Sequence, residues 1–125
     1  IPMRPAAPMG FGLLGDRKVF LLPGNPVSCF CAYDCFVARA LRWLGGRKPD
    51  WSYTSQAVRL KTKISSQIGR IEYVRLRLDD DGAEVLASGG ASILSSTTQA
   101  DAFFLTEEES EGIAADETIS VWRYD

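Results

Sequence analysis

The sequence contains no histidine. Catalytic arrangements that pair a serine or cysteine nucleophile with an imidazole base are therefore excluded. There is also no signal peptide and no apolar run approaching the roughly 18 residues of a membrane span, so we expect no membrane partner. The formal net charge of −2 gives no indication of nucleic acid binding, and we expect no nucleic acid partner.

Cysteine is scarce, with three residues at Cys29, Cys31 and Cys35. An odd number on one predicted helix argues against a disulfide framework and favours a reducing compartment, so we expect a cytoplasmic protein. Metal binding by these thiols is disfavoured because a fourth ligand and the C-x-x-C spacing are missing. The acidic runs at 79–81 and 107–109 lack the spacing of a calcium loop. We therefore predict no metal ligand and assign the cysteines to packing.

Charge is divided unevenly along the 125 residues. Residues 1–50 carry seven basic and three acidic side chains, a net charge of +4, whereas residues 51–125 carry seven and thirteen, a net charge of −6. The basic first part is consistent with an anion site, although a solvated charge bias accounts for it equally well. The chain begins with Ile1 rather than methionine, and we expect it to start inside a larger protein.

Residues 19–28, VFLLPGNPVS, organise the rest of the chain. Four apolar residues typical of a buried strand lead into a loop of proline, glycine and asparagine, and an amphipathic segment follows. Asn25 is a good N-cap, and Pro26 suits the first helical position because it lacks an N–H. The pattern predicts a strand, a rigid turn and a helix whose start favours an anion, although such turns also serve as plain α/β connections.

Before this loop, residues 11–14 and 18–22 flank a turn and predict a β-hairpin. After it, the helix is expected to continue from Pro26 to the glycines at 45 and 46. Its predicted apolar face contains Val27, Phe30, Cys31, Val37, Ala38, Leu41 and Leu44. The polar stretch 45–50 resembles a linker, so we divide the chain into residues 1–48 and 49–125.

Beyond the linker the hydrophobic period becomes two, which indicates strands. Alternation predicts strands over residues 56–64 and 70–78, and three short strands are expected to follow over residues 83–87, 102–106 and 118–124. In the second of these, Val74 and Leu76 are expected to face the core, with Tyr73 and Arg75 on the opposite, non-core face. Five strands without a long helix predict a small β-barrel or a curled sheet. The small-residue loop that begins at Ser88 either admits a ligand to the backbone or only turns a corner.

Several stretches, taken in order, resemble the molybdopterin molybdenumtransferases of the MoeA family, whose eukaryotic relatives include the E domain of gephyrin. The resemblance rests on MRP at 3–5 with Pro8, Phe11-Gly12, LPGNPVS at 22–28, Gly69-Arg70 to Arg75, and Gly90 to Ser96. It implies an α/β plus β fold. Residues 1–48 would be the end of a MogA-like α/β subdomain, with hairpin, loop and helix, and residues 49–125 a small C-terminal β-barrel subdomain.

The resemblance also implies a function in molybdenum cofactor biosynthesis. The family's enzymes insert molybdate into adenylylated molybdopterin and release AMP with the help of Mg²⁺, as homodimers that follow a MogA-like adenylyltransferase. This chain lacks the family's upstream pterin-binding segment, so we expect it to be inactive alone. Two alternatives stay open: a gephyrin-like scaffold module, and a non-catalytic paralogue that binds a pterin or molybdate.

Site residues follow from the matching motifs. Arg75 matches the family's barrel arginine and is expected to be the catalytic positive charge that faces molybdate or phosphate. The expected substrate-binding residues are Pro23, Gly24, Asn25, Pro26 and Ser28 of the loop, together with Arg4 and Ser92.

Two departures from the family pattern affect this assignment. Ala6 and Ala7 stand where the family often has Gly-Lys, so a basic group is missing. Ala91 stands where the family often has serine, and the nearest hydroxyl, at Ser92, lies one place later. These changes are the reason for keeping the non-catalytic alternative.

Overall fold

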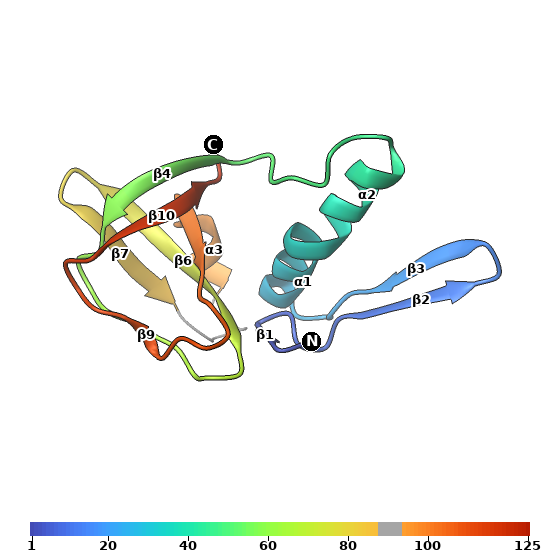
Figure 1. The fold of residues 1–125 in the computed structure, drawn as a ribbon, viewed down its shortest axis with the longest axis horizontal. Coiled ribbons are helices and arrows are strands. Elements are labelled where there is room, and N and C mark those ends of the chain that lie inside the picture. Colours follow the sequence, from blue (N-terminus) through green and yellow to red (C-terminus); the bar gives the residue numbers. More distant parts are fainter. Residues whose placement is uncertain (88–93) are drawn as a thin grey trace.

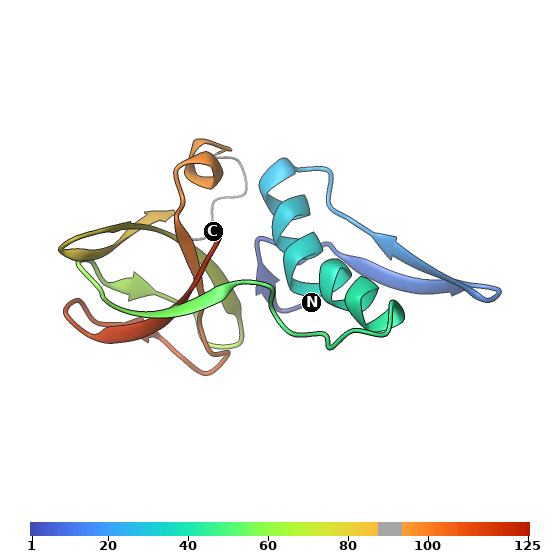
Figure 2. The ribbon, with the colours of Figure 1, turned by 90° about the horizontal axis from the view of Figure 1, so that it is seen from above.

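A helical segment lies between a β-hairpin and a curled β-sheet in the computed structural model, which describes residues 1–87 and 94–125 (Figure 1). The hairpin and the sheet are on opposite sides of the helix when the molecule is seen from above (Figure 2). None of the helices in the described ranges has the length and apolarity needed to cross a membrane. Because the helix lies between the hairpin and the sheet, it is the element that both of them contact (Figure 2).

The hairpin consists of β2 (Gly10–Leu14) and β3 (Arg17–Leu21), paired antiparallel from Gly10 opposite Leu21 to Leu14 opposite Arg17. It confirms the predicted hairpin. Most of its side chains are exposed, and its tip points away from the rest of the molecule (Figure 1).

The helix runs without a break through α1 (Pro26–Ala32), a π-helical turn η1 (Tyr33–Val37) and α2 (Ala38–Leu44). Its extent confirms the prediction. Its predicted apolar face is only partly buried: Val27, Cys31 and Val37 are covered, whereas Phe30, Leu41 and Leu44 are exposed. The described chain therefore covers only part of the predicted apolar face of the helix.

The main sheet has the strand order β1-β6-β8-β10-β4, and β7 pairs with β6. These strands are β1 (Met3–Arg4), β4 (Thr54–Arg59), β6 (Ile71–Asp79), β7 (Gly82–Ala87), β8 (Ala102–Leu105) and β10 (Thr118–Arg123). β1 pairs parallel with β6, and the other pairs are antiparallel. Two short strands, β5 (Ile64–Ser65) and β9 (Gly112–Ile113), pair with each other.

Among residues 1–87 and 94–125, regular strand pairing does not close this sheet into a barrel. Directly after β4, an isolated bridge joins Leu60 to Ala83 of β7, and the Lys61 N–H donates to the Ala83 carbonyl at 2.8 Å. The predicted strand over 56–64 is too long, because pairing with β10 ends at Arg59 and the chain then bends toward β7. Part of the predicted small-residue loop is also helical, as α3 (Leu94–Thr98).

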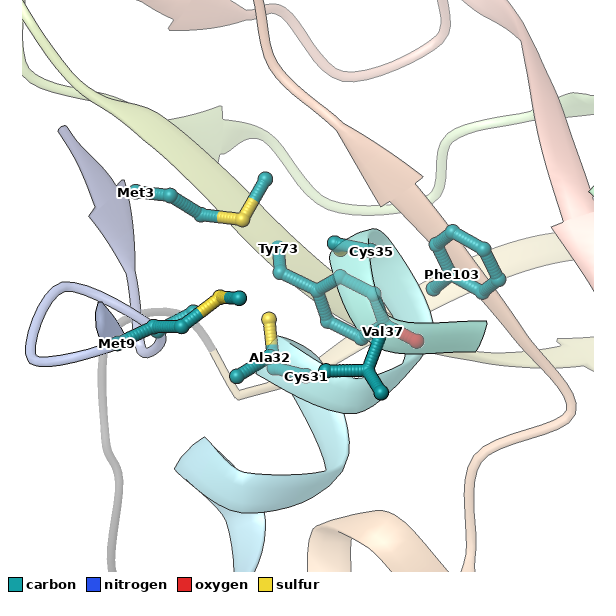
Figure 3. Close-up of a cluster of buried hydrophobic side chains, with 9 residues drawn as sticks. Met3, Met9, Cys31, Ala32, Cys35, Val37, Tyr73 and Phe103 are labelled. Carbon is teal, nitrogen blue, oxygen red and sulfur yellow. The ribbon is translucent and has the colours of Figure 1, made fainter. Parts of the chain in front are cut away.

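Two groups of buried side chains form the core. One lies within the curled sheet and includes Val58, Leu60, Val74, Leu76 and Val121. The other lies between the helix and the sheet and contains Met3, Ala6, Met9, Cys31, Ala32, Cys35, Val37, Tyr73 and Phe103 (Figure 3). The sheet is therefore covered on its second face by the helix.

This second core corrects the prediction for β6. Alternation predicts a non-core face for Tyr73 and Arg75, but their side chains are only 5% and 2% exposed. Alternation in a strand distinguishes its two faces, but it does not show whether another element covers the polar one. Here the helix covers it.

Candidate functional site

The helix start is capped as predicted. Asn25 has extended backbone angles, φ −72° and ψ 129°, and its Oδ1 accepts hydrogen bonds from the N–H groups of Val27 at 3.1 Å and Ser28 at 3.5 Å. Pro26 occupies the first helical position. Since Asn25 occupies these two donors, the helix start offers a ligand mainly the positive end of its dipole.

Replacing Asn25 by alanine tests the cap. We expect Asn25→Ala to lower the free energy of unfolding by about 1 kcal/mol, within the roughly 0.5–2 kcal/mol range of such caps, because two N–H groups lose their acceptor. Asn25→Asp keeps an acceptor and is the matched control. Urea denaturation of the three proteins measures the difference, and equal midpoints for the alanine and aspartate variants would contradict the capping role.

The predicted loop residues lie around this helix start. Gly24 and Pro26 are exposed, and Pro23 and Asn25 are half-buried. Ser28 is 4% exposed and belongs to the packed side of the helix. A ligand at the loop surface would therefore meet the two prolines and Gly24 before the Ser28 hydroxyl.

Arg75 lies in the middle of β6 and lines a cavity of about 310 Å³ between the helix and the sheet. The other lining residues are Val27, Phe30, Cys31, Tyr33, Asp34, Tyr53, Tyr73, Thr97, Ala100 and Tyr124. Burial lowers the pKa of the Arg75 guanidinium, and the nearby Tyr124, Cys31 and Tyr73 act in the opposite direction. Arginine stays protonated in proteins even so, and the cavity therefore has a permanent positive charge in its wall.

The structure places Arg75 near the start of the helix, but none of the predicted loop residues is among those that line its cavity. Val27, which lies between Pro26 and Ser28, lines the same cavity as Arg75. Arg4 is placed elsewhere: it is exposed on β1, in register with Glu72 of β6. Burial raises the pKa of the Glu72 carboxyl, and the Arg4 charge counteracts this.

Ser92 lies outside the described residues, as does the Ala91 position. Substrate binding by the Ser92 hydroxyl therefore stays a prediction from the sequence.

A carboxylate that the sequence did not single out also lines the cavity. Asp34 Oδ1 accepts a hydrogen bond from the Tyr53 hydroxyl at 2.5 Å, and its Oδ2 accepts one from the Tyr73 hydroxyl at 3.1 Å. The Tyr73 and Tyr124 hydroxyls are 2.7 Å apart. The helical spacing from Val27 could have placed Asp34 on the cavity face, but its charge favoured a solvent position.

Asp34 should make stability depend on pH. Burial raises its pKa above 3.8, whereas the Tyr53 and Tyr73 hydroxyls counteract the shift. The other ionisable groups that line the same cavity are Cys31, Tyr33, Arg75 and Tyr124. The folded state therefore binds the proton more tightly than the unfolded state. Stability from this group is greatest below the unfolded pKa and falls as pH rises through the raised pKa.

Asp34→Asn isolates this effect. In urea titrations at a series of acidic pH values, we expect the stability of the native protein relative to the variant to decline as pH rises and then to level off. A constant difference between the two proteins across this range would contradict the raised pKa.

Within the two described ranges, no group of three or more His, Cys, Asp or Glu side chains is placed to hold a metal ion. Cys31 and Cys35 are packed in the core between helix and sheet, and Cys29 is half-buried.

A second hollow, of about 620 Å³, lies between the helix and the hairpin and has almost entirely apolar walls. Phe11, Phe20, Phe36, Trp43 and Leu44 are among its lining residues. Several of its apolar lining side chains are strongly exposed, including Trp43 at 64%, Phe11 at 60% and Ile1 at 50%. A monomer in water rarely leaves so much contiguous apolar surface uncovered.

Comparison with known proteins gives consistent matches. A family model described as the MoeA C-terminal region (domain IV) matches residues 57–124. Molybdopterin molybdenumtransferase 1 of Mycobacterium tuberculosis is 34% identical over 133 aligned positions, which cover 97% of this chain and 31% of the relative. The molybdopterin molybdenumtransferase of Haemophilus influenzae is 27% identical, with the same two coverages of 97% and 31%.

Solved structures agree with these matches. The crystal structure of the molybdopterin biosynthesis MoeA protein from Pyrococcus horikoshii superposes with a TM-score of 0.85 at 31% identity, covering 98% of this chain and 30% of that protein. A molybdenum cofactor biosynthesis protein from Pyrococcus furiosus gives a TM-score of 0.84 at 33% identity, covering 98% of this chain and 43% of that protein. The chain thus spans about a third of the length of the two curated relatives.

Proposed function

The chain belongs to the MoeA family, and on this basis we propose that it forms the C-terminal part of an enzyme that inserts molybdate into adenylylated molybdopterin with release of AMP. The observation that carries this proposal is the buried guanidinium of Arg75 in a cavity shared with the start of the helix. The relatives are named for molybdenum transfer to molybdopterin. Both substrates of that reaction are anionic.

Arg75 suits an oxyanion for two reasons. Its guanidinium presents several N–H donors in a planar fork that matches two oxygens of a phosphate or a molybdate. Its burial in β6 removes competing water, so its attraction for an anion is stronger than at the surface. The positive end of the helix dipole at Pro26 adds to the same field. We assign Arg75 to holding and orienting the oxyanion.

The loop would contribute shape rather than charge. Pro23 and Pro26 fix the backbone on both sides of Gly24 and Asn25, and the cap of Asn25 holds the helix start in one conformation. A preorganised wall of this kind loses no free energy to rearrangement when a substrate binds. We propose that it borders the pterin-phosphate end of the substrate.

Other parts of the proposal extend beyond this chain. We infer that residues 1–48 correspond to the end of a MogA-like α/β subdomain and residues 49–125 to a barrel-like subdomain. A chain of a third of the relatives' length would be inactive alone, and the apolar hollow beside Trp43 would be covered by more of the protein or by the second copy in a homodimer. A MogA-like adenylyltransferase would supply the substrate in the cytoplasm.

Mg²⁺, which the family resemblance implies, finds no fitting ligand set among residues 1–87 and 94–125. Mg²⁺ is usually held by one or two carboxylates together with water and substrate phosphates, and the carboxylate in the wall of the Arg75 cavity is already bonded to two tyrosines. We assign no step to this ion.

Arg75→Ala tests the catalytic assignment. In the complete reading frame that carries this chain, we expect the rate of molybdenum insertion to fall by about 100-fold to 1000-fold, the usual loss when one preorganised donor is removed. Arg75→Lys keeps the charge but not the planar fork and should give an intermediate rate. Molybdopterin conversion with purified protein and adenylylated substrate is the measurement.

Arg77→Ala is the matched control, since Arg77 lies two residues along the same strand but is exposed and bonded to Gln99. It should leave the rate unchanged. Full activity of Arg75→Ala would refute the catalytic assignment and favour the gephyrin-like scaffold or the non-catalytic binding protein.

A further inference from the structure

One carboxylate connects the helix to three separate segments of the sheet part of the molecule. Asp34 lies on η1, whereas Tyr53 follows the linker, Tyr73 lies in β6, and Tyr124 directly follows β10. Tyr53 and Tyr73 donate to the two oxygens of Asp34, and Tyr124 bonds to Tyr73. The half-buried carboxylate of Asp34 thus joins the two parts of the chain.

The phenols are suited to this donor role. Burial and the Asp34 charge both raise the pKa values of Tyr53 and Tyr73. Both hydroxyls are therefore protonated donors at neutral pH. The bonds to Asp34 are charge-assisted whenever Asp34 is ionised, and such bonds are stronger and more sensitive to geometry than neutral ones.

The same network fixes the strand that carries Arg75. Tyr73 and Arg75 are two residues apart in β6 and point to the same face, toward the helix. The Tyr73 ring stacks on Phe103, with ring centroids 4.6 Å apart and planes 11° from parallel. The ring is therefore held by packing while its hydroxyl is held by Asp34, and a displacement of Tyr73 would move Arg75 with it.

Asp34 is also positioned by an unusual backbone. It belongs to the π-helical turn, in which the Ala38 N–H bonds to the Tyr33 carbonyl. Single π-helical turns within α-helices occur often at functional sites. Seven residues separate Asp34 from Val27, and both line the Arg75 cavity. The helix thus links the capped loop and the Asp34 network as one rigid element.

We propose that Asp34 is a positioning residue, whose carboxylate holds Tyr53 and Tyr73 and thereby sets the place of Arg75 relative to the helix start. The expected effect of Asp34 on the reaction rate rests on the proposed function. Its expected effect on how the helix is held against the sheet does not. Asp34 acts through Arg75 and does not itself contact the oxyanion. A misplacement of about 1 Å at a reacting group can lower a rate about 100-fold.

Residual dipolar couplings of the isotope-labelled chain test the geometry. In the native protein, amide couplings of residues 26–44 and of the sheet should fit a single alignment tensor, because the two parts are rigidly joined. Asp34→Ala should require two tensors, and Asp34→Glu should restore a single one by keeping the acceptor oxygens. Asp16→Ala, in the exposed turn of the hairpin, is the control. A single tensor for Asp34→Ala would overturn the proposal.

Tyr53→Phe provides a second variant if Asp34→Ala does not fold, since it removes one oxygen atom and keeps the packed ring. The variant should stay folded, but the couplings of the helix and of the sheet should fit a single alignment tensor less well than in the native protein. Couplings identical to those of the native protein would overturn the proposal.

The kinetics of the protein encoded by the complete reading frame test whether Asp34 positions Arg75 for the reaction. Asp34→Ala should lower kcat about 10-fold to 100-fold with KM nearly unchanged, because an interaction specific to the transition state is weakened. Asp34→Glu should recover part of the rate. Native kcat in Asp34→Ala would overturn the proposal, provided that Arg75→Ala is inactive. Should Arg75→Ala be fully active, the proposed function fails, and the dipolar couplings alone decide the role of Asp34.

Discussion

Phe103→Ala should lower the free energy of unfolding by about 3–5 kcal/mol, the loss expected for truncating a fully buried aromatic side chain. Phe103 is 0% exposed and lies between the helix and the sheet (Figure 3). Its ring stacks on Tyr73 and meets Trp51 and Tyr53 edge to face, with centroids 5.3 Å and 5.4 Å away. Removing it leaves a cavity where the two parts of the chain join.

This loss is a large part of the total stability of an ordinary domain, about 5–15 kcal/mol. Urea denaturation followed by tryptophan fluorescence measures it. Phe11→Ala is the matched control, because Phe11 is 60% exposed and contacts Phe20 in the hairpin. A change below about 1 kcal/mol is expected there, as for most surface substitutions. Similar losses for the two variants would contradict the assignment of Phe103 to the junction core.

Gly82→Ala should be the second severe substitution, with a loss of about 2–4 kcal/mol, the sum of a strained backbone and a lost hydrogen bond. Gly82 has φ +136°, and a Cβ at this position would lie 2.3 Å from the carbonyl oxygen of Arg59. The strained backbone costs about 1–3 kcal/mol. Relieving the contact separates β7 from the end of β4, so the hydrogen bond from Lys61 to Ala83 is also lost, at about 1 kcal/mol.

Gly69→Ala separates the cost of a strained backbone from the cost of a contact with a neighbouring strand. Gly69 also has a positive φ, +86°, but nothing lies within 4 Å of the added Cβ. It should cost only the left-handed backbone, about 1–2 kcal/mol. Thermal and urea unfolding of the two variants give the comparison, and equal losses would show that the contact with Arg59 is unimportant.

Features set by neighbouring residues were predictable from the sequence. The Asn25 cap and Pro26 at the first helical turn depend on a few consecutive residues, and the structure has both where they were predicted. The hairpin around its turn and the strand over residues 70–78 were predicted for the same reason. Local hydrogen bonding and hydrophobic period decide these elements, so no knowledge of the fold was required.

Features set by long-range contacts were not predictable in this way. Tyr73 and Arg75 looked solvent-facing because nothing in an alternating strand shows that a helix covers its polar side. The strand over 56–64 ends early because the chain bends toward β7 at Leu60, which alternation does not reveal. The alternation of apolar and polar residues continues across this bend, although the chain pairs with β10 before it and meets β7 after it.

In the candidate site, too, some residues could be predicted from the sequence and others depend on long-range contacts. Arg75 and the loop were singled out by motif, and the structure adds that Arg75 shares a cavity with Val27, in the first turn of the helix after the loop. Asp34 was missed because its partners, Tyr53 and Tyr73, lie 19 and 39 residues away. A charged residue in an amphipathic helix is usually assigned to the solvated face. The packing of the helix against the sheet makes this half-buried carboxylate an acceptor for two tyrosine hydroxyls.

The exposed hairpin has a consequence for how the chain is handled in the laboratory. A two-stranded ribbon has little stability by itself in water, and β2 and β3 pair only with each other in the described chain. Their local opening therefore needs much less free energy than global unfolding, and exposed backbone that opens in this way is where proteases cut first. Limited proteolysis should nick residues 10–21 while the sheet stays intact, and any partner that seats on the hairpin would be recognised by the protection it gives.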